Sequence, residues 1–264
     1  MRADIYLMRF HYAESRQKAQ ILIKNGAVSI DGRLISKASE DIDELSEHKV
    51  DVELSEADRY VSRGAIKLVG ALDGFDISPN GCVCIDIGAS TGGFTDCLLK
   101  KGAARVYAFD SGRDQLHPKL LSDSRVVSKE GFNARYLSFD DVGEMCDIAV
   151  MDVSFISQTM IIPRIPAILK SEGVFVGLIK PQFEAGRDAL GKNGIVKDSG
   201  SRLKAAVRVV ECAASFGLQC RGFMRSPIKG GDGNEEYLAC FVNSGKELPE
   251  NERIALYKQI KETV

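Results

Sequence analysis

The sequence predicts an α/β fold built on a doubly wound, mostly parallel sheet. From residue 82 onwards, short apolar runs typical of buried strands alternate with longer amphipathic stretches typical of helices. The first apolar run, at 82–87, leads into a turn of small residues and then into a helical pattern. A strand, a glycine-containing turn and a helix in this order commonly form a nucleotide site, so this stretch also predicts where the ligand binds.

Strands are expected in this part of the chain at 82–87, 104–109, 125–128, 147–152, 173–179, 218–225 and 237–242. The helices that cover the sheet are expected at 63–74, 93–101, 157–170 and 199–216, with shorter or irregular pieces near 114–121 and 133–141. Ser62 is expected to cap the first of these helices. Residues 246–264 are expected to form a short polar segment and a terminal helix.

The first 58 residues differ in charge pattern and predict a separate small domain. Residues 1–37 carry seven Lys or Arg against three acidic residues, whereas residues 38–58 carry nine acidic residues against one lysine. Ser15 and Asn25-Gly26 are the expected caps of a helix over 16–24, and a small hairpin follows it. Basic side chains around such a helix suit a reader of the RNA backbone, and a solvated basic face explains the same charges equally well.

The composition argues against several other classes of protein. The 264 residues carry a formal net charge of −2, which argues against indiscriminate binding of nucleic acid. The seven cysteines include no C-x-x-C pair and the three histidines are well separated, so we expect neither a metal site nor a disulfide framework. No secretory signal and no run of about 18 apolar residues is present, which predicts a cytoplasmic protein without a membrane span. Nothing reads as a subunit interface, so we expect a monomer.

The turn after the first strand predicts the ligand. Its spacing is G-x-x-x-G-G rather than the G-x-G-x-x-G of a dinucleotide fold, with glycines at 88, 92 and 93. Asp86 would repel a phosphate but suits an ammonium group, and Asp110 ends the next strand where carboxylates bind ribose hydroxyls. A ligand with an amino acid and a nucleoside but no phosphate is S-adenosylmethionine. An ordinary tight turn of an α/β protein is the competing interpretation.

The expected cofactor-binding residues combine this turn with the ends of the next strands. Asn133 follows the third strand and is the candidate for the adenine edge. Asp86 either contacts the ammonium group, directly or through water, or only braces the turn. The full set is Asp86, Gly88, Ala89, Ser90, Gly92, Asp110 and Asn133.

Polar residues at the ends of apolar strands are the candidates for catalysis. Asp152 ends one apolar run, and Lys180 closes another, where the following proline keeps it extended. Glu236 opens the last strand and competes with Glu235, because alternation places the two side chains on opposite faces. Lys67 lies beside the apolar side of its helix, where periodicity alone favours a surface lysine.

Two parts of the chain resemble known families. Residues 15–32 contain S-R-x-x-A and then G-x-V-x-I-D-G, followed by a lysine at 37, and resemble the S4-like (alpha-L) RNA-binding domain. The remainder resembles the TlyA family of the FtsJ-like group in R-Y-V-S-R-G-A-I-K-L at 59–68, D-I-G-A-S-T-G-G-F-T-D at 86–96, D-V-S-F-I-S at 152–157 and K-P-Q-F-E at 180–184. The wider FtsJ group usually follows its motif aspartate with Met-Ala-Pro, and the Val-Ser-Phe found here places the chain with TlyA.

The resemblance implies a Rossmann-like class I S-adenosylmethionine-dependent methyltransferase domain preceded by a small α+β S4-like domain. It implies methyl transfer from S-adenosylmethionine to the ribose 2′-hydroxyl of cytidine in ribosomal RNA of the small subunit, the large subunit or both. The implied catalytic residues are Lys67, Asp152, Lys180 and Glu236. Lys180 is expected to act as base or oxyanion stabiliser with Asp152 orienting it, while the other two tune charge and hold the ribose.

The predicted organisation is an S4-like RNA-binding domain at 1–58, a linker at 59–63, a methyltransferase domain at 64–245 and a C-terminal helical tail at 246–264. RNA contacts are expected from the basic residues of the first domain and linker, and from a glycine-rich loop after residue 184 that closes over RNA or is simply a surface loop. The expected RNA-binding residues are Arg2, Arg9, Arg16, Lys18, Lys24, Lys37, Arg59, Arg63, Arg187 and Lys192.

Three other functions compete with this interpretation. A pore-forming haemolysin is suggested only by a name often given to the family. A non-catalytic RNA-binding or ribosome-assembly factor would use the same fold, but the glycine turn and all four catalytic positions are intact. A small-molecule methyltransferase would leave the S4-like domain without a purpose.

Overall fold

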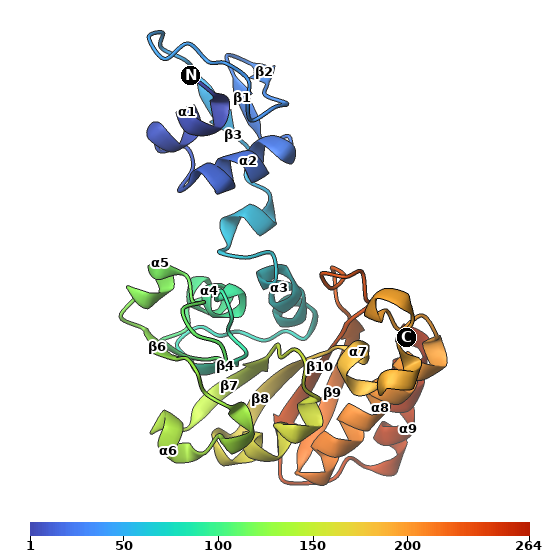
Figure 1. The fold of residues 1–264 in the computed structure, drawn as a ribbon. Coiled ribbons are helices and arrows are strands. Elements are labelled where there is room, and N and C mark those ends of the chain that lie inside the picture. The colour runs from blue at the N-terminus through green and yellow to red at the C-terminus, as the bar shows by residue number, and fades with distance from the viewer. The chain divides into compact units, whose positions relative to one another are not determined.

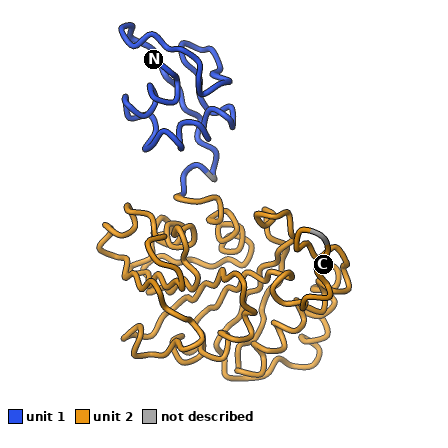
Figure 2. Tube along the Cα trace, in the orientation of Figure 1, with its two compact units in different colours: residues 1–60 blue, residues 61–264 orange. Residues whose placement is uncertain are grey.

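The structure is a computed structural model that describes residues 1–56, 58–191 and 193–264. It divides into two compact units, residues 1–60 and residues 61–264 (Figure 2). The division falls inside the segment 59–63 that the sequence predicts as a linker. Each unit has a hydrophobic cluster of its own and is described separately below.

The smaller unit combines two helices with a three-stranded antiparallel sheet of order β2-β1-β3. Its elements are α1 (Ala3–Arg9), α2 (Arg16–Lys24), β1 (Val28–Ile30), β2 (Arg33–Leu34), β3 (Val50–Val52) and a 3₁₀ turn (Glu56–Arg59). Helix α2 begins as the sequence predicts, because the Ser15 side chain accepts a hydrogen bond from the Lys18 backbone N–H (3.1 Å). Leu7, Leu22 and Val28 are fully or almost fully buried and join both helices to the sheet.

The larger unit contains a seven-stranded sheet of order β6-β5-β4-β7-β8-β10-β9, which confirms the predicted fold class. Strands β6, β5, β4, β7 and β8 are parallel to one another. Strand β10 is antiparallel to both of its neighbours, β8 and β9. The strands are β4 (Val83–Ile87), β5 (Arg105–Phe109), β6 (Val126–Lys129), β7 (Cys146–Met151), β8 (Leu169–Ile179), β9 (Leu218–Arg225) and β10 (Tyr237–Asn243).

Helices cover both faces of this sheet, with α3 and α4 on one face and α8 and α9 on the other (Figure 1). The helices are α3 (Ala65–Gly74), α4 (Gly93–Lys100), α5 (Pro118–Leu121), α6 (Phe139–Val142), α7 (Pro181–Glu184), α8 (Ser199–Ser215) and α9 (Glu250–Thr263). Because both faces are covered, the central strands are apolar along most of their length, as the sequence predicts. The rings of Phe175 and Phe241 stack across neighbouring strands with centroids 5.3 Å apart.

Two predicted elements are wrong. The helix expected at 157–170 is replaced by two 3₁₀ segments, Gln158–Met160 and Ile162–Ala167, and strand β8 begins directly after them. Pro163 and Pro166 lack the backbone N–H that an α-helix needs in its interior, which explains the loss of the helix. Ser62 does not cap α3, whose N-cap is Gly64 with no side-chain hydrogen bond.

Candidate functional site

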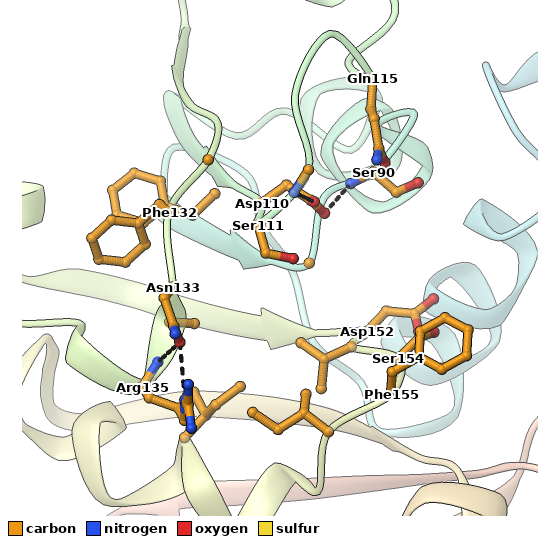
Figure 3. A pocket seen from close by; sticks show the side chains of 18 residues that line it. Ser90, Asp110, Ser111, Gln115, Phe132, Asn133, Arg135, Asp152, Ser154 and Phe155 are labelled. Atoms are coloured by element: carbon orange, nitrogen blue, oxygen red, sulfur yellow. Dashed lines mark hydrogen bonds between the residues drawn. The ribbon is translucent and has the colours of Figure 1, made fainter.

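A cavity of about 890 Å³ opens at the C-terminal ends of the parallel strands of the larger unit. Figure 3 shows Asp152, Ser154 and Phe155 projecting from one side of this cavity and Phe132 and Asn133 from the other. Its lining also includes Gly88, Ser90, Asp110, Ser111, Gln115 and Arg135. The end of a parallel sheet is where ligands bind in such folds, so the cavity is in the expected place.

The glycine turn after β4 brings the backbone close to this cavity. Gly88 has φ +90°, and a Cβ there would lie 2.4 Å from the backbone oxygen of Asp152. A larger residue would therefore push β4 and β7 apart at the cavity wall. Gly92 (φ +94°) is the N-cap of α4, where the backbone must turn sharply into the helix.

Asp110, predicted to bind ribose, joins two of the turns that line the cavity. One carboxylate oxygen accepts a hydrogen bond from Ser90 N (2.8 Å), and the other accepts one from Gly112 N (2.6 Å) (Figure 3). The loop that follows is held by Glu130, which accepts three backbone N–H groups at 2.7–3.0 Å, those of Asp114, Gln115 and Leu116. The role of Glu130 could not be predicted from the sequence, because the loop that it binds is brought to the end of β6 only by the fold.

Asn133, the candidate for the adenine edge, lies on the wall of the large cavity. Its side-chain oxygen accepts hydrogen bonds from the backbone N and from Nε of Arg135, both at 3.2 Å (Figure 3). The neighbouring Phe132 ring contributes an apolar surface to the same wall and carries the Lys129 ammonium 4.5 Å from its centroid. The wall beside Asn133 therefore combines the apolar ring of Phe132 with the guanidinium group of Arg135.

Asp86 lies beneath the turn and is completely buried. One of its oxygens accepts a hydrogen bond from Thr95 Oγ1 of α4 (2.7 Å), and the other has no partner among the described residues. Burial raises the pKa of Asp86 to about 7. This carboxyl group ties the turn to α4, and its second oxygen has an unused capacity to accept a hydrogen bond.

Lys180 and Asp152 form an ion pair at the neighbouring ends of β8 and β7, with Nζ 2.6 Å from Oδ1. The Lys180 ammonium also donates a hydrogen bond to Ser154 Oγ (2.8 Å). The Lys180 and Asp152 side chains are 11% and 20% exposed. All three residues, together with Gly88 and Ser90, line a second cavity of about 190 Å³.

Lys67 and Glu236 form a second ion pair, with Nζ 2.6 Å from Oε2 and side chains that are only 10% and 2% exposed. The surface position that periodicity favours for Lys67 is therefore wrong, because its ammonium is turned inward to a buried carboxylate. Gln182 Nε2 donates a longer hydrogen bond to the other Glu236 oxygen (3.4 Å). Glu235 points instead toward Arg202 (3.5 Å), so Glu236 is the member of this pair that meets Lys67.

Phe155 is a residue of the site that the sequence analysis did not assign. It is 92% exposed, has φ +63° and lines the large cavity. Its ring lies 5.2 Å from that of Phe183, centroid to centroid. A non-glycine residue held in the left-handed region, with an apolar ring in solvent, indicates a functional constraint. Sequence could signal only an aromatic residue close to the motif aspartate.

Most predicted RNA-binding residues of the smaller unit are already engaged. Asp4 is completely buried and receives the guanidinium Nε atoms of Arg2 (3.0 Å) and Arg16 (2.9 Å). Arg9 pairs with Glu44 (2.9 Å). These arginines hold their own unit together, whatever else they contact.

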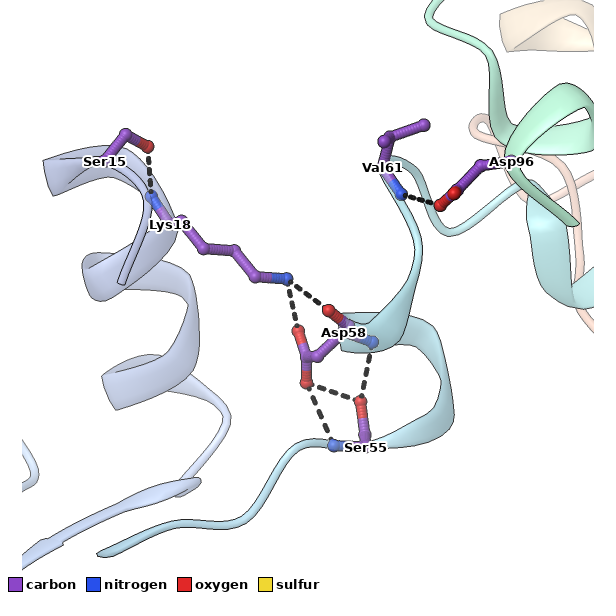
Figure 4. A network of polar contacts seen from close by, with 6 residues as sticks. All are labelled: Ser15, Lys18, Ser55, Asp58, Val61 and Asp96. Carbon is purple, nitrogen blue, oxygen red and sulfur yellow. Dashed lines mark hydrogen bonds and ion pairs between the residues drawn. The ribbon is translucent and has the colours of Figure 1, made fainter. Parts of the chain in front are cut away.

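Lys18 is engaged in the same way. Its ammonium binds the Asp58 carboxylate (3.0 Å) and backbone oxygen (3.2 Å) in the network of Figure 4. The same figure shows, within the larger unit, Val61 N donating to Asp96 (3.0 Å). Lys24 and Lys37 are exposed and form no ion pair with the residues that the structure describes.

The remaining predicted RNA contacts lie elsewhere. Arg59 and Arg63 are exposed near the junction of the two units, and Arg187 is exposed in a 3₁₀ turn after α7. Lys192 lies outside the described residues. Among the residues that the structure does describe, no group of His, Cys, Asp and Glu is arranged to hold a metal ion, and no helix is long and apolar enough to cross a membrane.

The sheet order, the covered faces and the cavity at the glycine turn define a Rossmann-like methyltransferase domain. Comparison with known proteins agrees: the FtsJ-like methyltransferase profile matches residues 60–243, and the S4 domain profile matches residues 1–44. The chain belongs to the FtsJ-like methyltransferase family and, within it, to the TlyA proteins. It is thus an enzyme of the methyltransferase class, as the resemblance implies.

Relatives of this family match nearly the whole chain. The 16S/23S rRNA (cytidine-2′-O)-methyltransferase TlyA of Mycobacterium tuberculosis is 41% identical over 90% of this chain and 88% of its own. Hemolysin A of Brachyspira hyodysenteriae is 44% identical over 92% of this chain and all of its own. A solved structure from Streptococcus thermophilus, which also carries the hemolysin designation, has 40% identity and a TM-score of 0.75 over 100% of this chain and 94% of its own.

Proposed function

We propose that this enzyme transfers a methyl group from S-adenosylmethionine to the ribose 2′-hydroxyl of cytidine in ribosomal RNA. The observation that carries the proposal is the Lys180 amine, held by Asp152 and Ser154 beside the glycine turn. The name of the Mycobacterium tuberculosis relative supports the choice of reaction and substrate, and the S4 match supports an RNA partner.

The residues around the large cavity fit S-adenosylmethionine. The volume of the cavity, about 890 Å³, lies within the range of small-molecule sites. The turn at Gly88 leaves no room for a Cβ. Gly88, Ala89, Ser90 and Gly92 would hold the methionine end, Asp110 the ribose, and Asn133 with Phe132 the adenine. Asp86 would serve the ammonium group through its unused oxygen. When bound, this cofactor supplies an electrophilic methyl group on a positively charged sulfur.

Lys180 is the residue we assign to the 2′-hydroxyl proton. Ser154 can accept a hydrogen bond from the charged ammonium or donate one to the neutral amine, so Nζ stays in place in both protonation states. Asp152 stabilises the ammonium once it has taken up the proton. Lys67 and Glu236 would set the charge around this centre from a buried position.

Phe155 is the residue we assign to the target base. Its exposed ring, braced by Phe183, offers a flat apolar surface at the mouth of the cavity. Nucleotides that react within folded RNA are turned out of their stack, and aromatic side chains commonly stack on such bases. The exposed Lys24, Lys37, Arg63 and Arg187 would add phosphate contacts and a salt-dependent affinity.

The decisive experiment is transfer of labelled methyl from S-adenosylmethionine to purified small and large ribosomal subunits from a strain that lacks the enzyme. Lys180→Ala is compared with Lys170→Ala, which changes a lysine on the same strand at its opposite end. We expect label on a cytidine 2′-oxygen with the wild type and Lys170→Ala, and none with Lys180→Ala. Cofactor binding without any label on subunits or free ribosomal RNA would overturn the proposal, and leakage of liposomes by the pure protein would support the haemolysin alternative.

A further inference from the structure

Glu184 is a buried carboxylate for which the proposed mechanism has no use. It ends the short helix α7 directly after Lys180 and is only 3% exposed. One oxygen accepts the backbone N–H of Gln158 (2.7 Å), and the other accepts the hydroxyl of Ser157 (2.5 Å). Burial raises the pKa of Glu184, and these two hydrogen bonds favour its charged form. A carboxylate is retained in such a place only if both oxygens are satisfied, as they are here.

The partners of Glu184 belong to the segment that carries Asp152, Ser154 and Phe155. This segment, residues 152–158, and the segment 180–184 run along each other and are joined by three successive sets of contacts, or levels. At the first level Lys180 donates a hydrogen bond to Ser154 (2.8 Å), and at the second the Phe183 ring packs against the Phe155 ring (5.2 Å between centroids). At the third level Glu184 accepts hydrogen bonds from Ser157 and Gln158.

The first two levels cannot fix the segment by themselves. Asp152 N still donates a hydrogen bond to Ile87 O of β4 (3.0 Å), but residues 153–157 lie beyond the end of β7. Phe155 has φ +63°, which a non-glycine residue keeps only when its surroundings hold it there. In the proposed function the substrate approaches Lys180 and Phe155, so their alignment has to be held from outside the substrate's path.

The third level is firmly attached to the rest of the domain. The backbone oxygen of Glu184 accepts a hydrogen bond from Arg208 of α8 (3.2 Å), and Gln158 donates its side-chain amide to the backbone oxygen of Leu178 in β8. Glu184 and Gln158 therefore connect residues 152–158 to helix α8 and strand β8.

We propose that Glu184 is a positioning residue that holds Ser154 and Phe155 in register with Lys180 and Phe183. This inference rests on the proposed function, in which Lys180 meets the ribose and Phe155 the base. The stretch K-P-Q-F-E at 180–184 then has two roles. Its first residue, Lys180, acts on the substrate, and its last residue, Glu184, aligns the segment 152–158.

The test compares Glu184→Ala, Glu184→Gln and Ser157→Ala with Asp147→Asn as matched control. Asp147 also accepts one backbone N–H (Val83, 2.9 Å) and one side-chain donor, but at the opposite end of β7. For each variant, kcat and KM for ribosomal RNA, the cofactor Kd and the Tm are measured at a temperature at which all variants are folded.

We expect Glu184→Ala to lower kcat by about tenfold or more, because small misplacements of reacting groups are costly, while the cofactor Kd changes by less than about threefold. Glu184→Gln keeps one acceptor oxygen, so its kcat should lie between that of Glu184→Ala and that of the wild type. Ser157→Ala loses one of the two hydrogen bonds, so it shows a smaller effect of the same kind and carries the test if Glu184→Ala does not fold. Asp147→Asn lowers Tm with kcat unchanged.

A second readout does not depend on activity. The chain has no tryptophan, so Phe155→Trp supplies a single tryptophan, whose fluorescence can be excited selectively, on the segment. We expect its fluorescence anisotropy to fall when Glu184→Ala is added. Unchanged anisotropy and a kcat per folded molecule equal to that of the wild type would show that Glu184 is only structural, and would overturn the inference. A wild type that methylates no ribosomal RNA would overturn the proposed function instead, and would leave the anisotropy result to be judged by itself.

Discussion

Strands β7 and β8 have a lysine–aspartate ion pair at each end, and the two pairs differ in their exposure and in what surrounds them. At the N-terminal end of β7, Lys170 lies 2.7 Å from Asp147, with side chains 50% and 31% exposed. At the C-terminal end, Lys180 lies 2.6 Å from Asp152, with side chains 11% and 20% exposed. The second pair adjoins the glycine turn and both cavities, whereas the first faces solvent.

The two pairs have the same residue types, so the function we propose for the second pair depends on its place in the fold. Parallel strands direct their C-terminal ends to one edge of the sheet, where loops leave room for a ligand. The same two residue types at the other end only join neighbouring strands. A third pair, Lys67 with Glu236, is more deeply buried than either and lines neither of the two cavities described here.

The largest expected effect separates the two ends of β8. Lys180→Ala should lower methyl transfer by about 10³-fold, because loss of a positioned acid–base group typically costs about 10²–10⁴-fold. Lys170→Ala should leave the rate unchanged. Lys180→Arg, which keeps the charge but cannot give up a proton, should be nearly as inactive as Lys180→Ala. Single-turnover transfer to ribosomal RNA measures all three, and substantial activity of Lys180→Arg would reassign Lys180 to stabilisation of charge.

The buried pair should dominate stability. Lys67→Met leaves the Glu236 carboxylate without its partner and should cost about 3–5 kcal/mol of unfolding free energy, as is typical when one member of a buried pair is removed. Lys170→Met breaks an exposed pair and should cost at most about 1 kcal/mol. Urea unfolding of each variant measures the difference. Adding Glu236→Gln to Lys67→Met should recover most of the loss, and an additive double variant would contradict the coupling.

A smaller effect is expected from Asp86 and depends on pH. Burial raises its pKa to about 7, so the folded state retains a proton that the unfolded state releases near pH 4. The contribution of this group to stability is therefore full in acid and is lost as the pH rises from about 4 to about 7. Asp86→Asn keeps an acceptor for Thr95 and removes this titration.

The corresponding measurement is the Tm of the cofactor-free protein from pH 4 to pH 8. The variant should exceed the wild type by roughly 4 °C or more at pH 8 and by much less at pH 4, since each kcal/mol moves Tm by about 2–4 °C in a domain of this size. Its affinity for S-adenosylmethionine should fall at the same time. A Tm difference independent of pH would show that Asp86 does not titrate in this range.

Ser154 should have a modest effect that sharpens the comparison at the C-terminal ends of β7 and β8. Its hydroxyl holds Lys180 Nζ at 2.8 Å, and a hydrogen bond of this kind is worth about 1 kcal/mol, or about fivefold in rate. Ser154→Ala should lower kcat by this amount with little change in cofactor affinity, and Ser154→Thr should retain most of the activity. Equal rates for the alanine and threonine variants would exclude a role for the hydroxyl.

The smallest effect is expected in the smaller unit, where buried and exposed cations differ in the same way. Lys24→Ala with Lys37→Ala should weaken binding of ribosomal RNA and reduce its salt dependence by about one unit of slope per lost phosphate contact, without loss of stability. Arg16→Ala should instead lower the Tm, because the buried Asp4 loses a partner. Binding measured at several salt concentrations distinguishes these outcomes.

The amino-acid sequence by itself predicted the class of fold, most strand positions and the glycine turn. These features are local, because apolar runs, small residues at sharp turns and caps at helix ends each depend on residues that are close together in the sequence. The helix expected at 157–170 did not form, because Pro163 and Pro166 cannot donate the backbone hydrogen bonds of a helix interior. Asp152, Lys180 and Glu236 were candidates because of their places at strand ends, and the TlyA resemblance joined them with Lys67 into one catalytic set.

Tertiary structure decided how these residues are used. It buried Lys67, which periodicity places at the surface, and paired it with a carboxylate 169 positions away in the sequence. It also committed Arg2 and Arg16 to the buried Asp4, and joined Glu184 to Ser157 across two separate strand ends. Burial and pairing depend on what packs against a side chain from distant parts of the chain, and that information is absent from any short stretch of sequence. The sequence determined which chemical groups this protein possesses, and the fold determined which of them meet.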